Sequence, residues 1–305
     1  MDRVIDRLRD LLDGRRLCVL TGAGVSTDSG IPDYRGPSSP PRNPMTFQQF
    51  VGDPEFRNRY WARNHLGWRH MDAARPNDGH LALAELERAG VVSGVVTQNV
   101  DLLHTKARSR TVVDLHGTYA QVVCLECAHR MSRHTLAELL EEANPGFARA
   151  VAGEGAIEVA PDADAVVPDS VEFTIVDCPR CGGMLKPDIV YFGETVPRPR
   201  VDLAYSMVDD ADALVVVGSS LTVQSGLRFV RHAHRRGIPV AIVNRGVTRG
   251  DPLATLTVDA GCSETLRALA DQNRTRSSAW TSGRRDSGGR SRVERPIISS
   301  TSAAS

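Results

Sequence analysis

A short apolar run that leads directly into closely spaced glycines constrains the fold of this chain more than any other feature. Residues 17–20 are uninterrupted apolar side chains, as in a strand buried on both faces of a parallel sheet. Gly22 and Gly24 follow, and because glycine has no Cβ, the backbone there can turn sharply and approach a phosphate. The usual dinucleotide fingerprint, G-x-G-x-x-G, would need glycine where Thr27 stands. The loop therefore predicts a bound diphosphate, but it argues against a standard dehydrogenase that transfers hydride.

The same alternation of buried strand and helix recurs along most of the chain. Apolar runs predict strands at residues 91–96, 112–115, 213–217 and 239–243, and helical spacing of apolar side chains predicts helices at 2–13, 46–71, 80–89 and 225–236. Polar motifs stand just after several of these strands, which is where parallel sheets bind their ligands. The sequence thus predicts an α/β fold with a Rossmann-like, doubly wound parallel sheet.

Two Cys-x-x-Cys pairs interrupt this pattern. They are Cys124 with Cys127 and Cys178 with Cys181, and fifty residues separate them. Four thiolates match the tetrahedral preference of zinc and leave the metal no open position, so we expect one structural Zn²⁺. The gap exceeds the usual spacing of a zinc ribbon, so a small helical insert at residues 134–143 is expected between the pairs. A smaller zinc-binding domain is therefore predicted to be inserted in the larger fold.

The two ends of the chain carry no sign of membrane targeting. No apolar run is long enough for a transmembrane helix, and the charged N-terminus lacks the apolar centre of a secretory signal. We therefore expect a cytoplasmic protein, in which thiols stay reduced and able to bind metal. Residues 273–305 are rich in Ser, Gly and Arg. We expect them to form a disordered basic tail that is solvated rather than bound to nucleic acid or to an acidic partner.

Several short motifs follow one another in a fixed order. They are the glycine loop through Arg35, Thr-Gln-Asn-Val-Asp-Leu-Leu-His at 97–104, Leu-His-Gly at 115–117, both cysteine pairs, Lys-Pro-Asp-Ile-Val-Tyr-Phe-Gly-Glu at 186–194, Gly-Ser-Ser-Leu at 218–221 and Val-Asn at 243–244. Each motif alone is a weak signal. In this order, over residues from about 10 to 270, they resemble the sirtuins, a family of NAD-dependent protein-lysine deacylases. Residues 60–64 and 97–99 are most similar to the class II branch of that family.

The resemblance implies both a domain organisation and a reaction. Residues 1–119 and 187–272 would form the NAD-binding domain, residues 120–186 the zinc domain, and NAD would meet acyl-lysine in the cleft between them. NAD is then a substrate: the acyl oxygen attacks C1′ of the nicotinamide ribose, nicotinamide leaves, and the products are lysine and O-acyl-ADP-ribose. The alternative on the same scaffold is mono-ADP-ribosyl transfer or lipoamide cleavage. No membrane partner is expected, and the partners are acyl-lysine proteins.

The same resemblance assigns roles to individual residues. His116 is the expected general base, since an imidazole with a pKa near 6.5 suits proton transfer at neutral pH, and Asn99 is the second candidate catalytic residue. The candidate NAD contacts are Gly22, Ala23, Gly24, Asp33, Tyr34, Arg35, Gln98, Asn99, Asp101, Gly218, Ser219, Ser220, Asn244, Arg245, Gly246 and Cys262. The candidate substrate-binding residues are Val190, Phe192, Gly193 and Glu194, which resemble a strand that pairs with the substrate backbone.

Structural interpretations stand beside some of these roles. Taken alone, His116 would fit a structural histidine, and Asn99 and Asp101 would fit an Asx turn that closes a strand. Tyr60 and Arg63 resemble a Tyr-x-x-Arg pair that binds acidic acyl groups in one branch of the family, but a packing tyrosine with a surface arginine is favoured, so the acyl group stays open. An NAD-dependent dehydrogenase and a non-catalytic zinc module with a nucleic-acid-binding tail are the competing classes. The glycine spacing opposes the first, and the presence of the candidate catalytic residues opposes the second.

Overall fold

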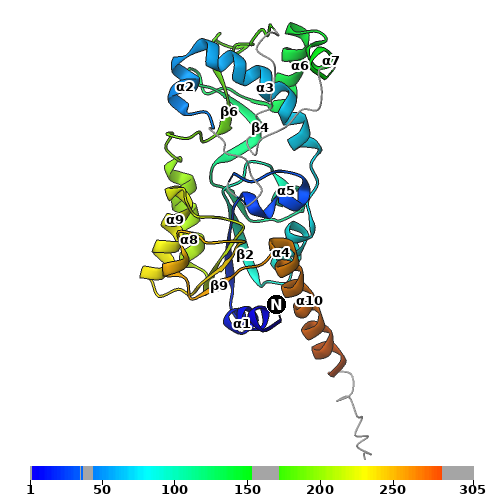
Figure 1. Cartoon of the computed structure of the whole chain (residues 1–305), viewed down its shortest axis with the longest axis vertical. Coiled ribbons are helices and arrows are strands. Elements are labelled where there is room, and N and C mark those ends of the chain that lie inside the picture. Colours follow the sequence, from blue (N-terminus) through cyan, green and yellow to red (C-terminus); the bar gives the residue numbers. More distant parts are fainter. Residues whose placement is uncertain (1, 35, 37–43, 153–171, 284–305) are drawn as a thin grey trace, which may run out of the picture. The chain divides into compact units, whose positions relative to one another are not determined.

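The computed structural model describes residues 2–34, 36, 44–152 and 172–283 of the chain (Figure 1). These residues divide between two compact units, Met1–Ala270 and Asp271–Ser305, and the candidate site belongs to the first unit. Within the described ranges, no helix is both long enough and apolar enough to cross a bilayer. The part of the expected tail at residues 284–305 lies outside the described residues.

A six-stranded, wholly parallel sheet forms the centre of the first unit. In spatial order its strands are β3 (Val112–Asp114), β2 (Val92–Thr97), β1 (Leu17–Thr21), β7 (Ala213–Val217), β8 (Val240–Val243) and β9 (Leu256–Val258). The chain builds outward from β1 to β3 and then returns to the other side of β1 with β7. This reversal between β1 and β7 leaves a crevice at the carboxyl ends of the strands, where such sheets bind ligands.

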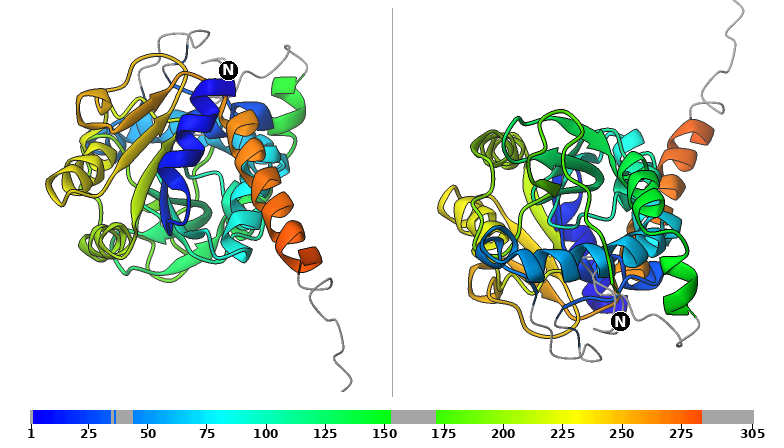
Figure 2. Two further views of the ribbon diagram at one scale, coloured as in Figure 1. Left: turned by 90° about the horizontal axis from the view of Figure 1, so that it is seen from below. Right: turned by 90° about the horizontal axis from the view of Figure 1, so that it is seen from above.

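Helices cover both faces of this sheet, as Figure 2 shows. On one face lie α1 (Asp2–Leu12), α4 (Asp78–Arg88) and the start of α10 (Cys262–Gly283); on the other lie α8 (Arg198–Asp209) and α9 (Gln224–Arg235). Alternate residues of β1 serve the two faces, since Val19 packs in the first core and Leu20 in the second. The doubly wound α/β fold predicted from the sequence is confirmed.

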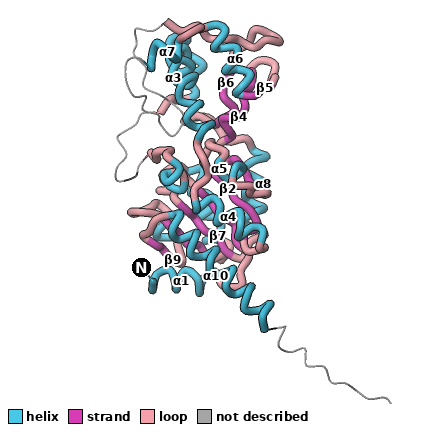
Figure 3. The backbone as a smooth tube through the Cα atoms, turned by 90° about the vertical axis from the view of Figure 1, so that its right-hand side faces the viewer, coloured by secondary structure: helices cyan, strands magenta, loops and turns pink. Residues whose placement is uncertain are grey.

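A second, smaller sheet is antiparallel, with the strand order β5-β4-β6. Its strands are β4 (Gly117–Cys124), β5 (Arg130–Ser132) and β6 (Leu185–Ile189), and the helices that pack with it are α2 (Phe47–Gly52), α3 (Pro54–Ala73), α6 (Arg133–Ala143) and α7 (Phe147–Ala152). We call these elements the small lobe. Figure 3 shows β4, β5 and β6 beside α3, α6 and α7, away from the strands of the large sheet.

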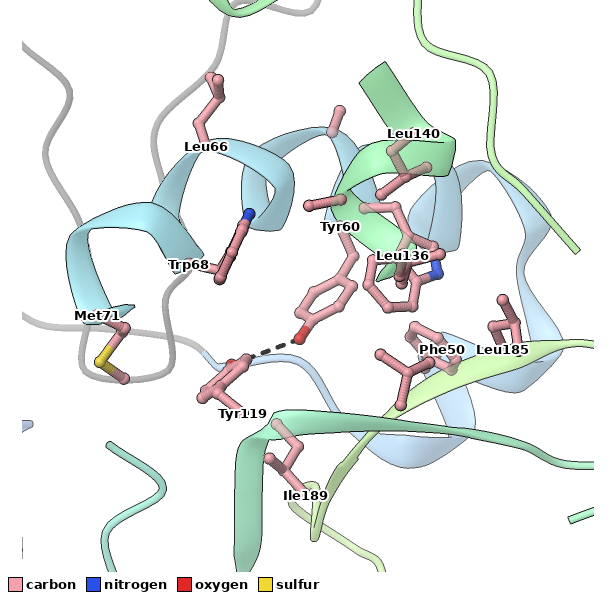
Figure 4. Close-up of a cluster of buried hydrophobic side chains, with 14 of the residues drawn as sticks. Phe50, Tyr60, Leu66, Trp68, Met71, Tyr119, Leu136, Leu140, Leu185 and Ile189 are labelled. Carbon is pink, nitrogen blue, oxygen red and sulfur yellow. Dashed lines mark hydrogen bonds between the residues drawn. The ribbon is translucent and has the colours of Figure 1, made fainter. Parts of the chain in front are cut away.

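The packing of α2 and α3 differs from the sequence-based domain boundaries. Residues 1–119 were expected to belong to the NAD-binding domain, but Phe50, Tyr60 and Trp68 lie in one buried cluster with Leu136 and Leu185 of the small lobe (Figure 4). The reason is the aromatic content of α2 and α3, whose apolar area is buried against β4, β6 and α6. The division of the chain at residues 119 and 187 stays a prediction.

Two local expectations also need correction. The helix expected at 46–71 is two helices, because Pro54 lacks an N–H and the Asp53 side chain accepts hydrogen bonds from Glu55 N and Phe56 N to begin α3. The tail was expected to lack structure from residue 273, but α10 continues to Gly283. The sequence contains neither glycine nor proline between Cys262 and Gly283, so nothing in that stretch breaks the helix.

Candidate active site

The candidate site is a cleft of about 910 Å³ at the carboxyl ends of β1, β2, β7 and β8, closed on one side by the segment that follows β6. The cleft gathers nearly all of the residues that the sequence singled out. Lining it are Gly22, Ala23, Gly24, Asp33, Tyr34, Gln98, Asn99, Asp101, His116, Val190, Phe192, Gly193, Glu194, Gly218, Ser219, Ser220, Asn244, Arg245 and Cys262. Gly246 does not line the cleft, because its N–H turns to Asp259 Oδ1 at 3.2 Å; Arg35 lies outside the described residues.

The glycine loop crosses the loop after β7 at very close range. Gly24 N donates to Gly218 O at 2.9 Å, and a Cβ on Gly22 would lie 2.8 Å from the same oxygen. Gly218 has φ +63°, and a Cβ there would lie 2.4 Å from Val25 N. A side chain at either position would separate the two loops, so the glycines are needed for this crossing at the switch point of the sheet.

A short hydrogen-bond network fixes the polar side chains after β2. Ser26 Oγ donates to Asp101 Oδ2 at 2.7 Å, and Asn99 Nδ2 donates to Ser26 Oγ at 3.0 Å and to Gly22 O at 3.2 Å. Asp101 Oδ1 accepts the N–H of Leu103, the first residue of α5 (Leu103–Lys106). The donors of Asn99 are thus engaged within the protein, and its side-chain oxygen is the atom left to accept a hydrogen bond from a ligand.

Buried threonine and histidine side chains support this network from below. Thr21 Oγ1 donates to Thr97 Oγ1 at 2.9 Å, so it accepts from His104 Nε2, also at 2.9 Å. Thr97 Oγ1 in turn accepts the N–H of Asn99 at 3.1 Å. Burial lowers the pKa of His104 well below 6.5 and that of the adjacent His80 to about 4, which keeps both rings neutral at neutral pH.

His116 lies at the junction of the large sheet and the small lobe, between β3 and β4. Its Nδ1 lies 2.9 Å from the carbonyl oxygen of Gln98, which can only accept, so Nδ1 carries the proton. Its Nε2 then accepts a hydrogen bond from Ser225 Oγ at 2.8 Å. Burial lowers the pKa of His116; the Gln98 carbonyl opposes this shift, and the charges of Arg200 and Arg228 add to it. The imidazole is therefore a neutral base at neutral pH, with its lone pair on Nε2.

The segment after β6 closes the cleft from the side of the small lobe. Val190 N donates to the carbonyl of His116 at 2.8 Å, and Glu194 Oε2 accepts the N–H of Tyr191 and pairs with Lys186 Nζ at 3.1 Å. The four candidate substrate-binding residues were expected in a strand, but β6 ends at Ile189. They lie instead in the segment held by the Lys186–Glu194 pair, which ends in a turn where Glu194 N donates to Tyr191 O at 3.0 Å. Phe192 in this segment forms an isolated bridge with Thr46.

The four cysteines of the two pairs come together in the small lobe. Their sulfur atoms all lie within 4.8 Å of one another, and the Cys124–Cys181 and Cys127–Cys178 sulfur distances are 3.5 and 3.8 Å. Tetrahedral zinc with Zn–S bonds of about 2.3 Å separates its sulfur ligands by about 3.8 Å, so the cluster fits Zn²⁺. None of the four cysteines lines the cleft, which agrees with a structural role.

Tyr60 does not take part in the cleft. Its ring is buried in the small-lobe core among Phe50, Trp61 and Tyr191, and its hydroxyl lies 3.4 Å from the hydroxyl of Tyr119 (Figure 4). Arg63 does not line the cleft either. Tyr60 thus has a packing role in the small-lobe core.

Among the polar cleft residues that sequence reasoning missed are Ser26, Ser225 and Arg228. Ser26 belongs to the glycine loop, and its position shortly after the strand could have indicated that it is near the ligand. Ser225 and Arg228 lie three residues apart near the start of α9, and that spacing puts them on one helix face. Nothing in the sequence shows that this face turns toward His116.

Comparison with known proteins gives a consistent result. The model of the Sir2 family matches residues 22–225. The NAD-dependent protein deacetylase 1 of Mycobacterium avium is 67% identical over 262 residues, which are 86% of this chain and 93% of that protein. The protein of the same name from Streptomyces coelicolor is 51% identical over 267 residues, with 86% and 88% covered.

Solved structures agree with this result. A structure of Sir2 with a p53 peptide and NAD+ has a TM-score of 0.70 and 30% identity, and the match covers 89% of this chain and 99% of that one. A structure of Sir2Tm bound to a propionylated peptide has a TM-score of 0.69 and 28% identity, covering 88% and 98%. The family model, the relatives and the shared fold lead to one conclusion: this chain belongs to the Sir2 family, the sirtuins.

Proposed function

We propose that this chain is an NAD-dependent protein-lysine deacylase, which transfers the acyl group of a modified lysine to ADP-ribose and releases nicotinamide. The observation that carries the proposal is the state of His116: the Gln98 carbonyl holds its Nδ1–H, so Nε2 is a neutral base that faces the cleft. The two relatives named NAD-dependent protein deacetylase, and the Sir2 structures with NAD+ or a propionylated peptide, support it.

In the proposed reaction, the acyl oxygen attacks C1′ of the nicotinamide ribose and nicotinamide leaves. Nε2 of His116 then takes a proton from a ribose hydroxyl, which attacks the acyl carbon, and water completes the release of lysine. Each turnover consumes one NAD and one water, and gives lysine, nicotinamide and O-acyl-ADP-ribose. When Nε2 is protonated, the hydrogen bond from Nδ1 to the Gln98 carbonyl stabilises the imidazolium.

The remaining cleft residues bind and orient the two substrates in this proposal. The glycine loop and the Ser219–Ser220 loop bind the diphosphate, and Asn244 and Arg245 bind the adenosine ribose. Asp101 is held by Ser26 and Leu103 N, so that it can receive the carboxamide of nicotinamide. The free side-chain oxygen of Asn99 accepts from a ribose hydroxyl. The segment 190–194 takes the backbone of the acyl-lysine protein.

The cysteine cluster bears on two further parts of the proposal, the bound metal and the cellular compartment of the protein. A bound Zn²⁺ would be held by Cys124, Cys127, Cys178 and Cys181, and it would cross-link the turn after β4 with the loop before β6. Because four thiolates must stay reduced to bind it, we further propose that the protein works in the cytoplasm.

The proposal is tested by mixing the full chain with NAD and peptides that carry acetyl-lysine or longer acyl-lysines, and measuring nicotinamide release and acyl transfer to ADP-ribose. The change His116→Ala should lower turnover by about 10²- to 10⁴-fold, because the base is lost, while NAD still binds. The matched control is His234→Gln, an exposed histidine of α9 outside the cleft, which should behave as the wild type.

Retained turnover in the His116→Ala variant would overturn the assignment of the base. The position of a label on NAD separates the reaction classes. Label that appears in O-acyl-ADP-ribose supports deacylation, whereas label that stays covalently on the protein partner indicates ADP-ribosyl transfer instead.

A further inference from the structure

Two arginines, Arg228 and Arg245, line the cleft among the residues that the structure describes. Arg245 follows β8, and its charge acts on Cys262 at the adenosine side of the proposed site. Arg228 lies on α9, three residues after Ser225, whose hydroxyl is bonded to Nε2 of His116. Residues three apart on a helix share a face, so Arg228 extends from the same side of α9 that meets the catalytic imidazole.

Arg228 differs from its cationic neighbours because they already have carboxylate partners. Arg200 and Arg130 both pair with Asp188, and Lys186 pairs with Glu194. Arg228 is half-buried and makes no hydrogen bond or ion pair with any residue within the described ranges. A guanidinium that is partly removed from water and has no anionic partner forms a strong charge-assisted hydrogen bond with an anionic ligand.

The acidic groups of the cleft are not available to Arg228. Asp101 is bonded to Ser26, Glu194 to Lys186, and Asp33 accepts the N–H of Gly36. The charge of Asp28 acts on His80 and Cys262. The positive charge of Arg228 acts instead on His116, whose pKa it lowers together with Arg200. The guanidinium of Arg228 thus lies close to His116, the proposed base of the acyl transfer.

We propose that Arg228 determines acyl specificity: its guanidinium binds the carboxylate at the far end of a dicarboxylic acyl group on lysine, such as succinyl. This inference rests on the proposed deacylase function and names the substrate class of that site. The planar fork of arginine matches a carboxylate with two parallel hydrogen bonds. The NAD phosphates have another place, at the glycine loop and the Ser219–Ser220 loop, so they do not need Arg228. Tyr60, buried in the small-lobe core, cannot serve this purpose.

Three peptides of one sequence test the proposal, with lysine carrying acetyl, succinyl, or the uncharged amide analogue of succinyl. The measurement is kcat/KM at saturating NAD for each peptide. In the wild type, succinyl should exceed its amide analogue by at least about 10-fold, since only the carboxylate forms a charge-assisted pair. Arg228→Gln should collapse that ratio by about 10- to 100-fold, and Arg228→Lys should retain part of it, because the charge remains without the fork.

The matched control is Arg231→Gln, which removes an equal charge one turn further along α9, at an exposed residue that does not itself line the cleft. It should leave the succinyl-to-amide ratio at the wild-type value. The KM for NAD of each variant is measured as well. A rise in that KM by the same factor with all three peptides would show that Arg228 binds the cofactor, and would overturn the proposal.

The possible failures are distinguishable. If acetyl-lysine is turned over but wild-type succinyl-lysine reacts no faster than its amide analogue, the acyl proposal is wrong and the deacylase function stands. If no peptide releases nicotinamide, both are wrong. If the wild type prefers succinyl and Arg228→Gln keeps that preference, another residue binds the carboxylate and the role proposed for Arg228 is wrong.

Discussion

The large parallel sheet and the small lobe are held together by different means. The inner strands β1, β7 and β8 of the large sheet are buried on both faces, and packing and the hydrogen-bond ladder hold the sheet together. The small lobe has three short antiparallel strands, a cluster of four cysteines and a fully buried arginine, Arg133, whose guanidinium lies 4.7 Å from the ring of Trp68. The polar network around His116 lies mainly on the loops of the large sheet. The small lobe thus adds a cluster of metal-binding type to its apolar core, while the part that bears most of the polar network does not.

Removing the metal should give the largest difference in stability between the two regions. In the variant Cys178→Ser, or after chelation, we expect the small lobe to lose its fixed structure, because structural zinc contributes about 10 kcal/mol or more of binding free energy to folding. The large sheet should remain folded, since its cores contain none of the four cysteines. Hydrogen exchange measured by mass spectrometry checks this: amides of β4 to β6 should lose protection while those of β1, β2 and β7 keep it.

Cys18→Ser is the matched control, since Cys18 is a buried cysteine of β1 with no part in the cluster. It should bind the same amount of zinc as the wild type and keep protection in β4 to β6. Equal loss of protection in both regions after chelation would contradict the separation of the two parts.

What the sequence could predict about these two regions follows from the distance over which each feature acts. The zinc cluster and the glycine loop are encoded locally, in C-x-x-C pairs and in glycines directly after a strand, so they could be predicted. The contact of His116 with Ser225 spans 109 residues and depends on how α9 packs against the sheet. For the same reason the free guanidinium of Arg228 and the docking of α2 and α3 on the small lobe became visible only in the structure.

Acid, unlike metal removal, should destabilise the large sheet more than the small lobe. Burial lowers the pKa of His80 to about 4 and of His104 well below 6.5, and their rings are 4.8 Å apart beneath the cleft. The unfolded chain therefore binds protons near pH 6.5 that the folded chain does not bind. Stability is fully present above that pH and falls as the pH drops toward 4, by about 1.4 kcal/mol per pH unit for each histidine. Asp114 opposes this trend, because burial raises its pKa to about 6.

The measurement is the free energy of unfolding in urea between pH 7 and 4.5, followed by probes in each region. His80→Gln should reduce the pH slope of the large sheet by about 1.4 kcal/mol per unit. His65→Gln is the counterpart in the small lobe, where burial lowers the pKa of His65 to about 4, and it should flatten only the slope of that lobe. A His80→Gln slope equal to that of the wild type would show that this ring is not the acid-sensitive group.

The smallest expected effect is that of a substitution in the core of the small lobe, and it tests whether that core takes part in acyl recognition. Tyr60→Phe removes a hydroxyl that lies 3.4 Å from Tyr119 Oη and accepts from Asn64 Nδ2 at 3.3 Å. Both distances are long, so the loss should destabilise the small lobe by only about 1 kcal/mol. Because the ring lies in the core and not in the cleft, the succinyl-to-amide ratio of kcat/KM should not change. Tyr119→Phe removes the other half of the same contact, and the double variant should lose less than the sum of the two single changes. A Tyr60→Phe protein that lost its preference among acyl groups would mean that the small-lobe core reaches the acyl chain after all, and that the two regions share the chemistry.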